Sequence, residues 1–204
     1  MIRSVWLALA FALAALAQTS SGLVREGGYW VDTITGSVAA GESVRVATAG
    51  AVHIQGEQRG DITYSLKRRV RARDEASARM LLNAIVVKAV REGMRTVLEV
   101  TGPDPRSAAD LRIRVPRKLR DASVESSGGA IEIADLDGAA RVATAAGAVD
   151  VNRIGGGVAV RTGGGNVRLD EIGGSVEFSI ICTPDRSAIM LPVRVTARKP
   201  PDVA

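Results

Sequence analysis

Aromatic residues are scarce in this chain of 204 residues. Trp, Tyr and Phe, with two copies of each, make up 3% of it. Phe178 is the single aromatic residue of the repeats near the C-terminal end, and its position predicts an inward side chain. The repeats therefore lack the exposed aromatic platforms on which polysaccharide-cleaving enzymes stack sugar rings.

Cysteine and histidine are nearly absent. Cys182 is the one cysteine, so no disulfide can form within the chain, and we expect a buried, inert thiol. His53, the one histidine, lies between two apolar residues on an expected outward face. With no second His or Cys nearby it makes no metal site by itself. The sequence predicts neither a metal nor a cofactor.

Motifs of nucleotide binding and of serine hydrolysis are also missing. The glycine runs Gly155–Gly157 and Gly163–Gly165 are not followed by the helix and Lys of a phosphate-binding loop, and no Ser-His-Asp arrangement is apparent. The net charge of +5 becomes +4 without Arg3, which lies in the expected signal peptide. So small an excess indicates non-specific attraction to anionic polymers, and we expect no specific nucleic-acid binding.

A nine-residue repeat dominates what the chain does contain. Between about residues 128 and 182 it reads GAIEIADLD, GAARVATAA, GAVDVNRIG, GGVAVRTGG, GNVRLDEIG and GSVEFSIIC. Each copy opens with Gly, and apolar residues follow two and four places later, which is the alternation of a strand. Copies match best in pairs, so the coil is expected to hold 18 residues and two strands. Three columns should then stack: Leu136, Ile154 and Ile172; Gly138, Gly156 and Gly174; and Ser126, Thr144 and Thr162.

These features predict an all-β protein built as a parallel β-solenoid (β-helix) of 18-residue, two-strand coils, about 4.8 Å apart. Glycine is expected at each corner because the chain reverses there with positive φ. A left-handed hexapeptide helix is excluded, since six-residue steps from Ile131 reach Asp137 and Arg161. A calcium-binding nonapeptide roll would need Asp in the turns, and a β-propeller would need periods of about forty residues or more.

The start of the chain predicts export. Residues 1–17 read as a signal peptide, with Arg3, the apolar run Val5–Leu16 and a cleavage site near Ala17. The run is short for a membrane anchor, so the mature chain is expected to have no transmembrane span. We expect an extracytoplasmic protein, located in the periplasm, on the cell surface or secreted.

The mature chain is expected to be one domain. Residues 18–42 read as a leader and N-terminal cap, with order beginning near Ser43. Residues 43–198 form the β-solenoid domain, with regular repeats over 111–181, and residues 199–204 a disordered tail. Ser43–Gln55 reads as a first, imperfect coil. Ile113 and Val115 precede Ile131 and Ile133 by one coil, and Ala188–Thr196 is expected to be a last strand over the open end.

Between the first coil and the repeats we expect other elements. Asp61–Arg73 reads as a strand whose basic residues (Lys67, Arg68, Arg69, Arg71 and Arg73) form a solvated face. One short helix over about residues 74–84 is expected to be capped by Asp74, with Ala76, Met80 and Ala84 on one side. Two strands, Ile85–Arg91 and Arg95–Thr101, then flank a Gly turn, with a helix through Val90 as the alternative.

Three segments carry a family resemblance: VPRKLRDASVESSGGAIEIADLDG, VATAAGAVDV and VRTGGGNVRLDEIGG. They resemble the bacterial putative-adhesin family, from about Ser43 to about Ile181. The resemblance implies an extracytoplasmic β-helical domain that is secreted or attached to the envelope. That family offers no established site, so no functional residue is carried over. After Ile181 the Gly-rich coils of the family do not continue.

Two columns of charge are the candidate sites. Glu132 and Asp150 are expected to stack on adjacent coils, close enough to share a cation or a proton, but Arg114 should precede them and Arg168 follow. A neighbouring column reads Asp135, Arg153, Glu171. Opposite charges at this spacing favour a structural ladder on a solvated sheet over a catalytic pair.

The function that follows is a non-enzymatic module that binds or structures an envelope or extracellular polymer. Short Gly and Ala turns leave little material for the walls of an enzyme cleft. Two alternatives remain open: an enzyme acting on an anionic polysaccharide through Glu132 and Asp150, and a scaffold that assembles end to end through its exposed coils.

Overall fold

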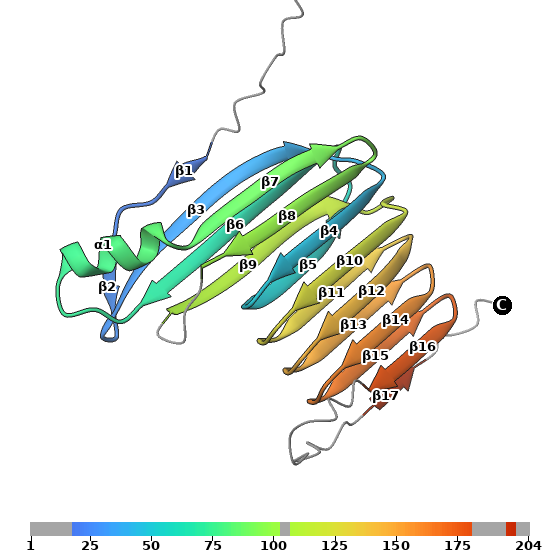
Figure 1. The fold of residues 1–204 in the computed structure, drawn as a ribbon. Helices are drawn as coiled ribbons and strands as arrows, with labels where there is room; N and C mark the ends of the chain where they lie inside the picture. Colours follow the sequence, from blue (N-terminus) through green and yellow to red (C-terminus); the bar gives the residue numbers. More distant parts are fainter. Residues whose placement is uncertain (1–17, 103–106, 181–194, 199–204) are drawn as a thin grey trace, which may run out of the picture.

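The structure is a computed structural model that describes residues 18–102, 107–180 and 195–198 (Figure 1). The expected signal peptide, Cys182 and the C-terminal tail lie outside these ranges, as does most of the strand expected over Ala188–Thr196. Within the described residues the chain is all-β, as predicted, with a single helix, α1 (Glu75–Asn83).

The described strands form two sheets of mixed and parallel strand direction. The first, of ten strands, has the order β1 (Thr19–Ser20), β3 (Tyr29–Ala39), β6 (Asp61–Val70), β9 (Ser107–Pro116), β5 (Ala51–Glu57), β11 (Ile131–Leu136), β13 (Val149–Ile154), β15 (Val167–Ile172) and β17 (Val195–Arg198), with β2 (Val24–Glu26) beside β3. The second, of seven strands, has the order β16 (Val176–Ile180), β14 (Val158–Thr162), β12 (Ala139–Thr144), β10 (Asp121–Ser126), β4 (Ser43–Thr48), β8 (Arg95–Thr101) and β7 (Val86–Glu92).

The predicted 18-residue offset is the observed register of the regular strands. Ile131 pairs in parallel with Val149, and Val149 with Val167. The seven-stranded sheet repeats the offset, since Ala122 pairs with Ala140. The expected columns of Leu136, Ile154 and Ile172, and of Ser126, Thr144 and Thr162, are confirmed.

Alternate residues of both sheets point into one apolar core. Its regular part is made of small and branched side chains: Val44, Val46, Val52, Ile54, Ala122, Val124, Ile131, Ile133, Ala140, Val142, Val149, Val151, Val158, Val160, Val167 and Leu169. All of these are at most 2% exposed. Complete burial of one Val, Leu or Ile side chain contributes about 1.5–3 kcal/mol, so this strict alternation fixes which face of each strand turns inward.

Glycine serves the two corners of each coil for different reasons. At one corner Gly129, Gly147 and Gly165 have positive φ, from 87° to 118°, as predicted. At the other, Gly138, Gly156 and Gly174 lie outside the left-handed region. A Cβ on any of these three would lie within 2.7 Å of backbone atoms of the preceding coil. The predicted reason is therefore wrong for this corner, where close packing of the coils excludes a side chain.

The segment before Ser43 is strand, not leader. β3 pairs with β6 in antiparallel direction over ten residues, from Trp30 with Val70 to Ala39 with Asp61. The apolar alternation of β3 is hidden because two inward positions are Asp32 and Gly36. Asp32 meets a buried arginine, and a Cβ on Gly36 would lie 2.3 Å from the hydroxyl of Tyr64.

Ser43–Gln55 contains two strands, β4 and β5, but their neighbours in the sheets differ from those expected of a first coil. β4 pairs in parallel with β10, and β5 pairs in parallel with both β9 and β11. The strand beside β11 is therefore β5, and the expected stacking of Ile113 on Ile131 is wrong. Beyond β9 the sheet continues with the antiparallel β6 and β3.

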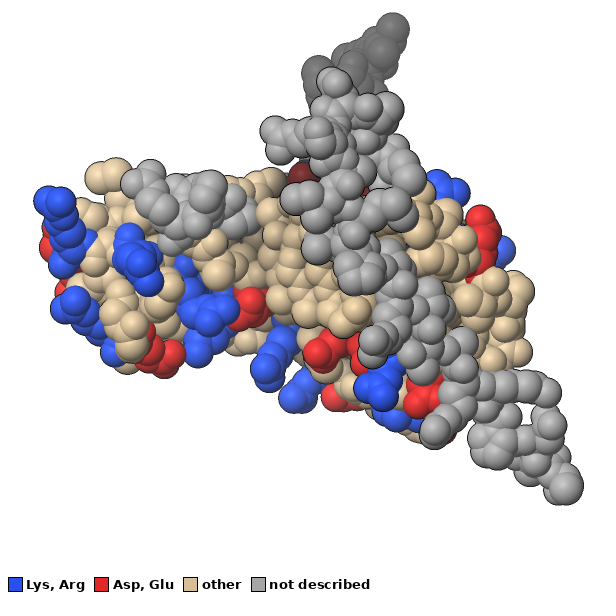
Figure 2. Space-filling model, turned by 90° about the horizontal axis from the view of Figure 1, so that it is seen from below, with Lys and Arg blue, Asp and Glu red and all other residues tan. Residues whose placement is uncertain are grey.

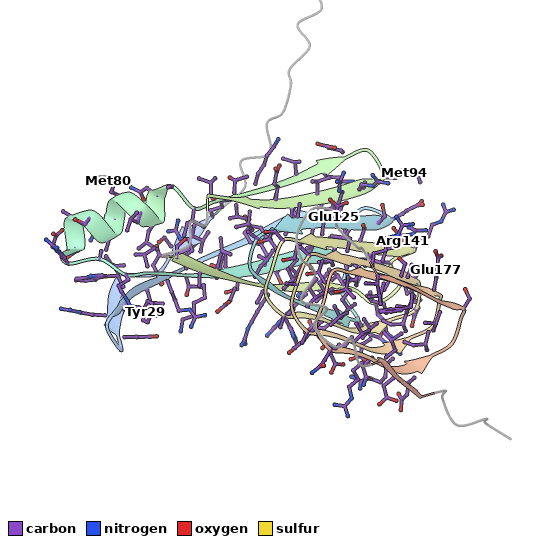
Figure 3. The ribbon with its side chains drawn as sticks, turned by 60° about the horizontal axis from the view of Figure 1, so that its bottom comes forward. Tyr29, Met80, Met94, Glu125, Arg141 and Glu177 are labelled. Carbon is purple, nitrogen blue, oxygen red and sulfur yellow. The ribbon has the colours of Figure 1, made fainter. Side chains whose placement is uncertain are left out.

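α1 begins as predicted, with the Asp74 carboxylate accepting a hydrogen bond from the Ser77 N–H at 2.8 Å. Its packed side is made by Ala78 and Leu82, while Met80 is 74% exposed and points away from the sheets (Figure 3). The side that carries Ala76, Met80 and Ala84 is therefore exposed. β7 and β8 form the predicted antiparallel hairpin, so the alternative of a longer helix is wrong.

Arg68 joins α1 to the ten-stranded sheet. Its Nε donates to Asp32 Oδ1 at 2.8 Å, and its Nη2 donates to the other carboxylate oxygen. Its Nη1 donates to the carbonyls of Leu82 and Ile85 at 2.7 and 2.8 Å, at the C-terminal end of the helix. The side chain is 8% exposed, so the prediction of a solvated basic face is wrong for Arg68.

Candidate functional site

A column of charged residues crosses the outward face of the ten-stranded sheet. Glu132 pairs in register with Asp150, and Asp150 with Arg168, as expected. On the other side, however, Glu132 pairs with His53, and His53 pairs with Arg112. The prediction that Arg114 precedes Glu132 is wrong, because β5 lies between β9 and β11.

Glu132 interacts with His53 rather than with Asp150. His53 Nδ1 lies 2.6 Å from Glu132 Oε2, and the two side chains are 43% and 57% exposed. Among the residues that the structure describes, the Asp150 carboxylate has no hydrogen-bond partner. The geometry is that of cross-strand charge pairs on a wet surface, whereas a catalytic acid or base is expected in a pocket that perturbs it.

The second column adopts an unusual backbone. Asp135, Arg153 and Glu171 have φ of 61°, 52° and 54°, in the left-handed region. Asp tolerates this region because its short side chain bonds locally, whereas Arg and Glu have no such advantage. The same position is left out of the paired register in each strand, since the pairing passes directly from Ala134 with Asn152 to Leu136 with Ile154.

An ion pair couples the first two coils of this column. Arg153 Nε and Nη2 donate to the two oxygens of Asp135 at 2.6 and 2.7 Å, and Gln55 donates to the same carboxylate at 2.6 Å. The pKa of Asp135 falls from 3.8 to about 2, chiefly because Arg153 donates hydrogen bonds to the carboxylate. The Gln55 hydrogen bond and the positive charges of Arg153 and Arg117 contribute to this fall, and burial opposes it. The predicted alternation of charge thus includes one strong pair.

Charges on the seven-stranded sheet are paired in the same way. Arg45 contacts Glu125 at 3.0 Å, and Arg141 contacts Asp121 at 2.5 Å. Glu125, Arg141 and Glu177 extend from this sheet in Figure 3. Cross-strand ion pairs therefore occur on the outward faces of both sheets.

One groove departs from this pattern, and we name it the arginine–hydroxyl groove. It has a volume of about 520 Å³ and crosses β1, β3, β6 and β9. Its lining is formed by Thr19, Thr35, Gly36, Ser37, Thr63, Tyr64, Ser65, Arg112 and Arg114. The lining holds two guanidinium groups and five aliphatic hydroxyls but no carboxylate.

Two other depressions are mixed in charge. One of about 350 Å³ includes His53, Asp110, Arg112 and Glu132. The other, of about 540 Å³, lies at the end of β5 and includes Glu57, Arg59, Lys118 and Asp137 among its lining. Each therefore holds carboxylates beside its cations, which the arginine–hydroxyl groove does not.

The sequence contained a signal for this groove that the repeats obscured. Ser and Thr occupy every second position in two segments, at Thr33, Thr35 and Ser37 and at Thr63 and Ser65. Such alternation is what a half-buried strand with a hydroxyl-rich outer face produces. The first segment reads as a leader in the sequence, so the sequence alone does not bring the two rows together.

Positive charge is uneven over the surface. Figure 2 shows that Lys and Arg predominate at the end of the molecule that carries α1, whereas both signs alternate toward the regular coils. Aromatic rings meet arginines at that end, where the Arg71 guanidinium lies 4.9 Å from the ring centre of Tyr29 (Figure 3). On the face that Figure 2 shows, positive charge is therefore concentrated toward the end that carries α1.

Metal ligands and membrane-spanning helices were both sought in the described residues. No group of three or more His, Cys, Asp or Glu side chains is arranged there to hold a metal ion. In the same part of the chain no helix has the length and hydropathy needed to cross a membrane.

Neither a protein-family model nor a curated protein matches this chain in sequence. Its fold is similar to that of a solved structure, a putative cell adhesion protein from Clostridium sporogenes. The TM-score is 0.51 at 10% identity, covering 90% of this chain and 100% of that one. A putative adhesin from Parabacteroides distasonis matches with a TM-score of 0.33 at 8% identity, over 82% of this chain and 79% of the other. The resemblance to putative adhesins predicted from the repeats is confirmed at the level of the fold.

Proposed function

We propose that the chain is a non-enzymatic, extracytoplasmic binding module of the adhesin type. Its regular part, made of β4, β5 and β10 to β16, would be a short parallel β-solenoid, widened at the N-terminal end by β3, β6 and β9. The molecule would present its outward faces to a polymer of the cell envelope or the extracellular matrix. The similarity in fold to a putative cell adhesion protein supports the same role.

The observation that carries this proposal is the outward face of the ten-stranded sheet. Polar side chains stand on it in straight columns, and its grooves are open rather than enclosed within the core. An extended polymer can lie along such a face and make many weak contacts, whereas a small substrate would remain largely in water.

The enzyme alternative has less support from the same face. Its two candidate carboxylates are Glu132, which is hydrogen-bonded to His53, and Asp150. Neither stands against a wall of long loops. We propose that the column is a cross-strand ladder, and the alternative would require cleavage activity that is lost in Glu132→Gln.

The test of the proposal is retention on isolated cell envelopes. The purified chain without the expected signal peptide is mixed with envelopes at low ionic strength and at about 0.15 M salt, where exposed charges more than about 8 Å apart are screened. We expect retention at both. Retention only at low salt would reduce the interaction to the basic excess, and no retention at either would overturn the proposal. Sedimentation of the chain alone controls for self-assembly.

A further inference from the structure

The arginine–hydroxyl groove is built from two parallel rows of side chains. Thr35 pairs with Ser65 and Ser65 with Arg112, while Ser37 pairs with Thr63 and Thr63 with Arg114. Each row thus reads hydroxyl, hydroxyl, guanidinium across three strands. Paired strands lie about 4.8 Å apart and residues two apart on a strand about 7 Å, so the donors form a flat grid on one face.

The guanidinium groups of the grid are available to a ligand. Among the described residues, Arg112 has neither an ion pair nor a hydrogen bond from its side chain. Arg114 has one ion pair, with Glu57 at 3.5 Å, and its side chain is 66% exposed. Elsewhere on the same sheet, Arg69 and Arg153 contact carboxylates at 2.6–2.8 Å.

Most hydroxyls of the grid are available as well. Thr35 donates to the carbonyl of Thr19 at 3.4 Å. The hydroxyls of Ser37, Thr63 and Ser65 have no protein partner in the described part of the chain. A hydroxyl can both donate and accept, which suits a ligand that carries hydroxyls of its own.

The chemistry of the grid selects among polymers. Arginine binds carboxylates through two parallel hydrogen bonds, and such charge-assisted bonds are stronger than neutral ones. The lining holds no carboxylate, so an anionic ligand meets two guanidinium groups there. The nearby carboxylates lie outside the lining: Glu57 contacts Arg114, and Asp110 and Glu132 line the neighbouring depression that shares Arg112. A neutral glycan would lose this contribution, and the buried Tyr64, 3% exposed, offers no open ring for it to stack on.

We propose that the arginine–hydroxyl groove binds a linear polysaccharide that carries carboxylate groups. Arg112 and Arg114 bind its carboxylates, and Ser37, Thr63 and Ser65 bind its ring hydroxyls. This inference rests on the proposed binding function and names its ligand class and its site.

The experiment measures binding of the chain to immobilised polygalacturonate at about 0.15 M salt, with dextran as the neutral polymer and polyphosphate as the carboxylate-free anion. Arg112→Gln is compared with Arg161→Gln as the matched control. Arg161 is exposed on β14 of the other sheet, has no ion pair among the described residues, and its substitution changes the net charge equally. We expect Arg112→Gln to raise Kd about 10- to 100-fold and Arg161→Gln to change it less than about twofold.

A second variant separates the groove from electrostatics in general. Thr63→Val exchanges a hydroxyl for a methyl group, keeps the charge and suits a strand, so urea unfolding should be nearly unchanged. We expect it to raise Kd about 2- to 10-fold, the effect of one neutral hydrogen bond. Dextran should not bind measurably.

Two outcomes would overturn the inference. Equal weakening by Arg112→Gln and Arg161→Gln would assign the affinity to net charge, and polyphosphate binding as tightly as polygalacturonate would assign it to anions in general. Either result leaves the proposed function intact if the wild-type chain is still retained on envelopes. Failure of that retention instead overturns the proposed function itself, whatever the purified polymers do.

Discussion

The ion pair between Asp135 and Arg153 allows a direct test of how neighbouring coils are held together. The change is Asp135→Asn. Asn has the same size and also tolerates the φ of 61° at this position, so the substitution removes charge without adding backbone strain. It removes the negative charge and one of the two oxygens that accept from Arg153 and Gln55, so we expect the free energy of unfolding to fall.

The magnitude follows from the pKa of Asp135. A carboxyl group whose pKa falls from 3.8 to about 2 on folding contributes about 2.4 kcal/mol, at 1.36 kcal/mol for each tenfold change in proton affinity. The Asp135 side chain is 17% exposed, but that of Arg153 is 48% exposed, so solvent weakens the pair. We therefore expect a loss of about 1–2 kcal/mol at pH 7.

The dependence on pH has a definite sign. Because the folded-state pKa of Asp135 lies below its unfolded value, the stabilisation is complete well above pH 3.8 and is lost as the pH falls toward 2. Urea unfolding of the wild type and of Asp135→Asn, measured at several pH values from 7 down to 2, should give curves that converge in this window.

Glu125→Gln is the matched control. Glu125 also pairs with an arginine, Arg45, but both side chains are about half exposed. Its replacement should cost less than about 1 kcal/mol. If Asp135→Asn were as stable as the wild type at pH 7, or if the difference did not shrink at low pH, the reasoning about this ion pair would be refuted.

Two further substitutions test the packing. Arg68→Met should lower the free energy of unfolding by about 3–5 kcal/mol in urea titrations, because it leaves the buried Asp32 carboxylate without its arginine and removes a donor from the carbonyls of Leu82 and Ile85. The control Arg69→Met, at a half-exposed pair, should lower it by less than about 1 kcal/mol, and similar losses in the two variants would contradict this account. Gly147→Ala should lower the free energy of unfolding by more than about 1 kcal/mol, because φ is 118° and the new Cβ would lie 2.1 Å from the carbonyl oxygen of Gly129. The control is Gly60→Ala, whose Cβ would meet nothing within 4 Å. Equal stability of the two variants would refute the steric argument.

The regular strands and their 18-residue register could be predicted from the sequence because their information is local. Apolar residues two apart and glycines nine apart fix both the strand faces and the register, and no other part of the chain is needed to interpret them. The hairpin of β7 and β8 and the Asp74 cap of α1 were predictable for the same reason.

What could not be predicted depends on partners distant in the sequence. Asp32 reads as a loop residue until Arg68 is placed beside it, and Gly36 reads as a break in a strand until Tyr64 fills the space. The neighbour of Glu132 on β5 is His53, which lies 79 positions earlier in the sequence. Nothing in the local sequence indicates that these two residues are adjacent in the sheet. The arginine–hydroxyl groove is likewise assembled from strands that are not adjacent in the chain.

The positions of β4 and β5 in the two sheets affect how the protein can fold during its synthesis. Ser43 pairs with Asp121, 78 positions later, whereas each later coil closes a loop of 18. Closing the longer loop costs about 1.3 kcal/mol more in chain entropy. Every partner strand of β4 and β5 begins at or beyond residue 95. As the chain emerges from the ribosome, the future middle of the molecule is therefore the segment that waits longest for its partners. A chain that stalls before residue 95 leaves β4 and β5 without partners on either edge, and such edges can pair with neighbouring chains.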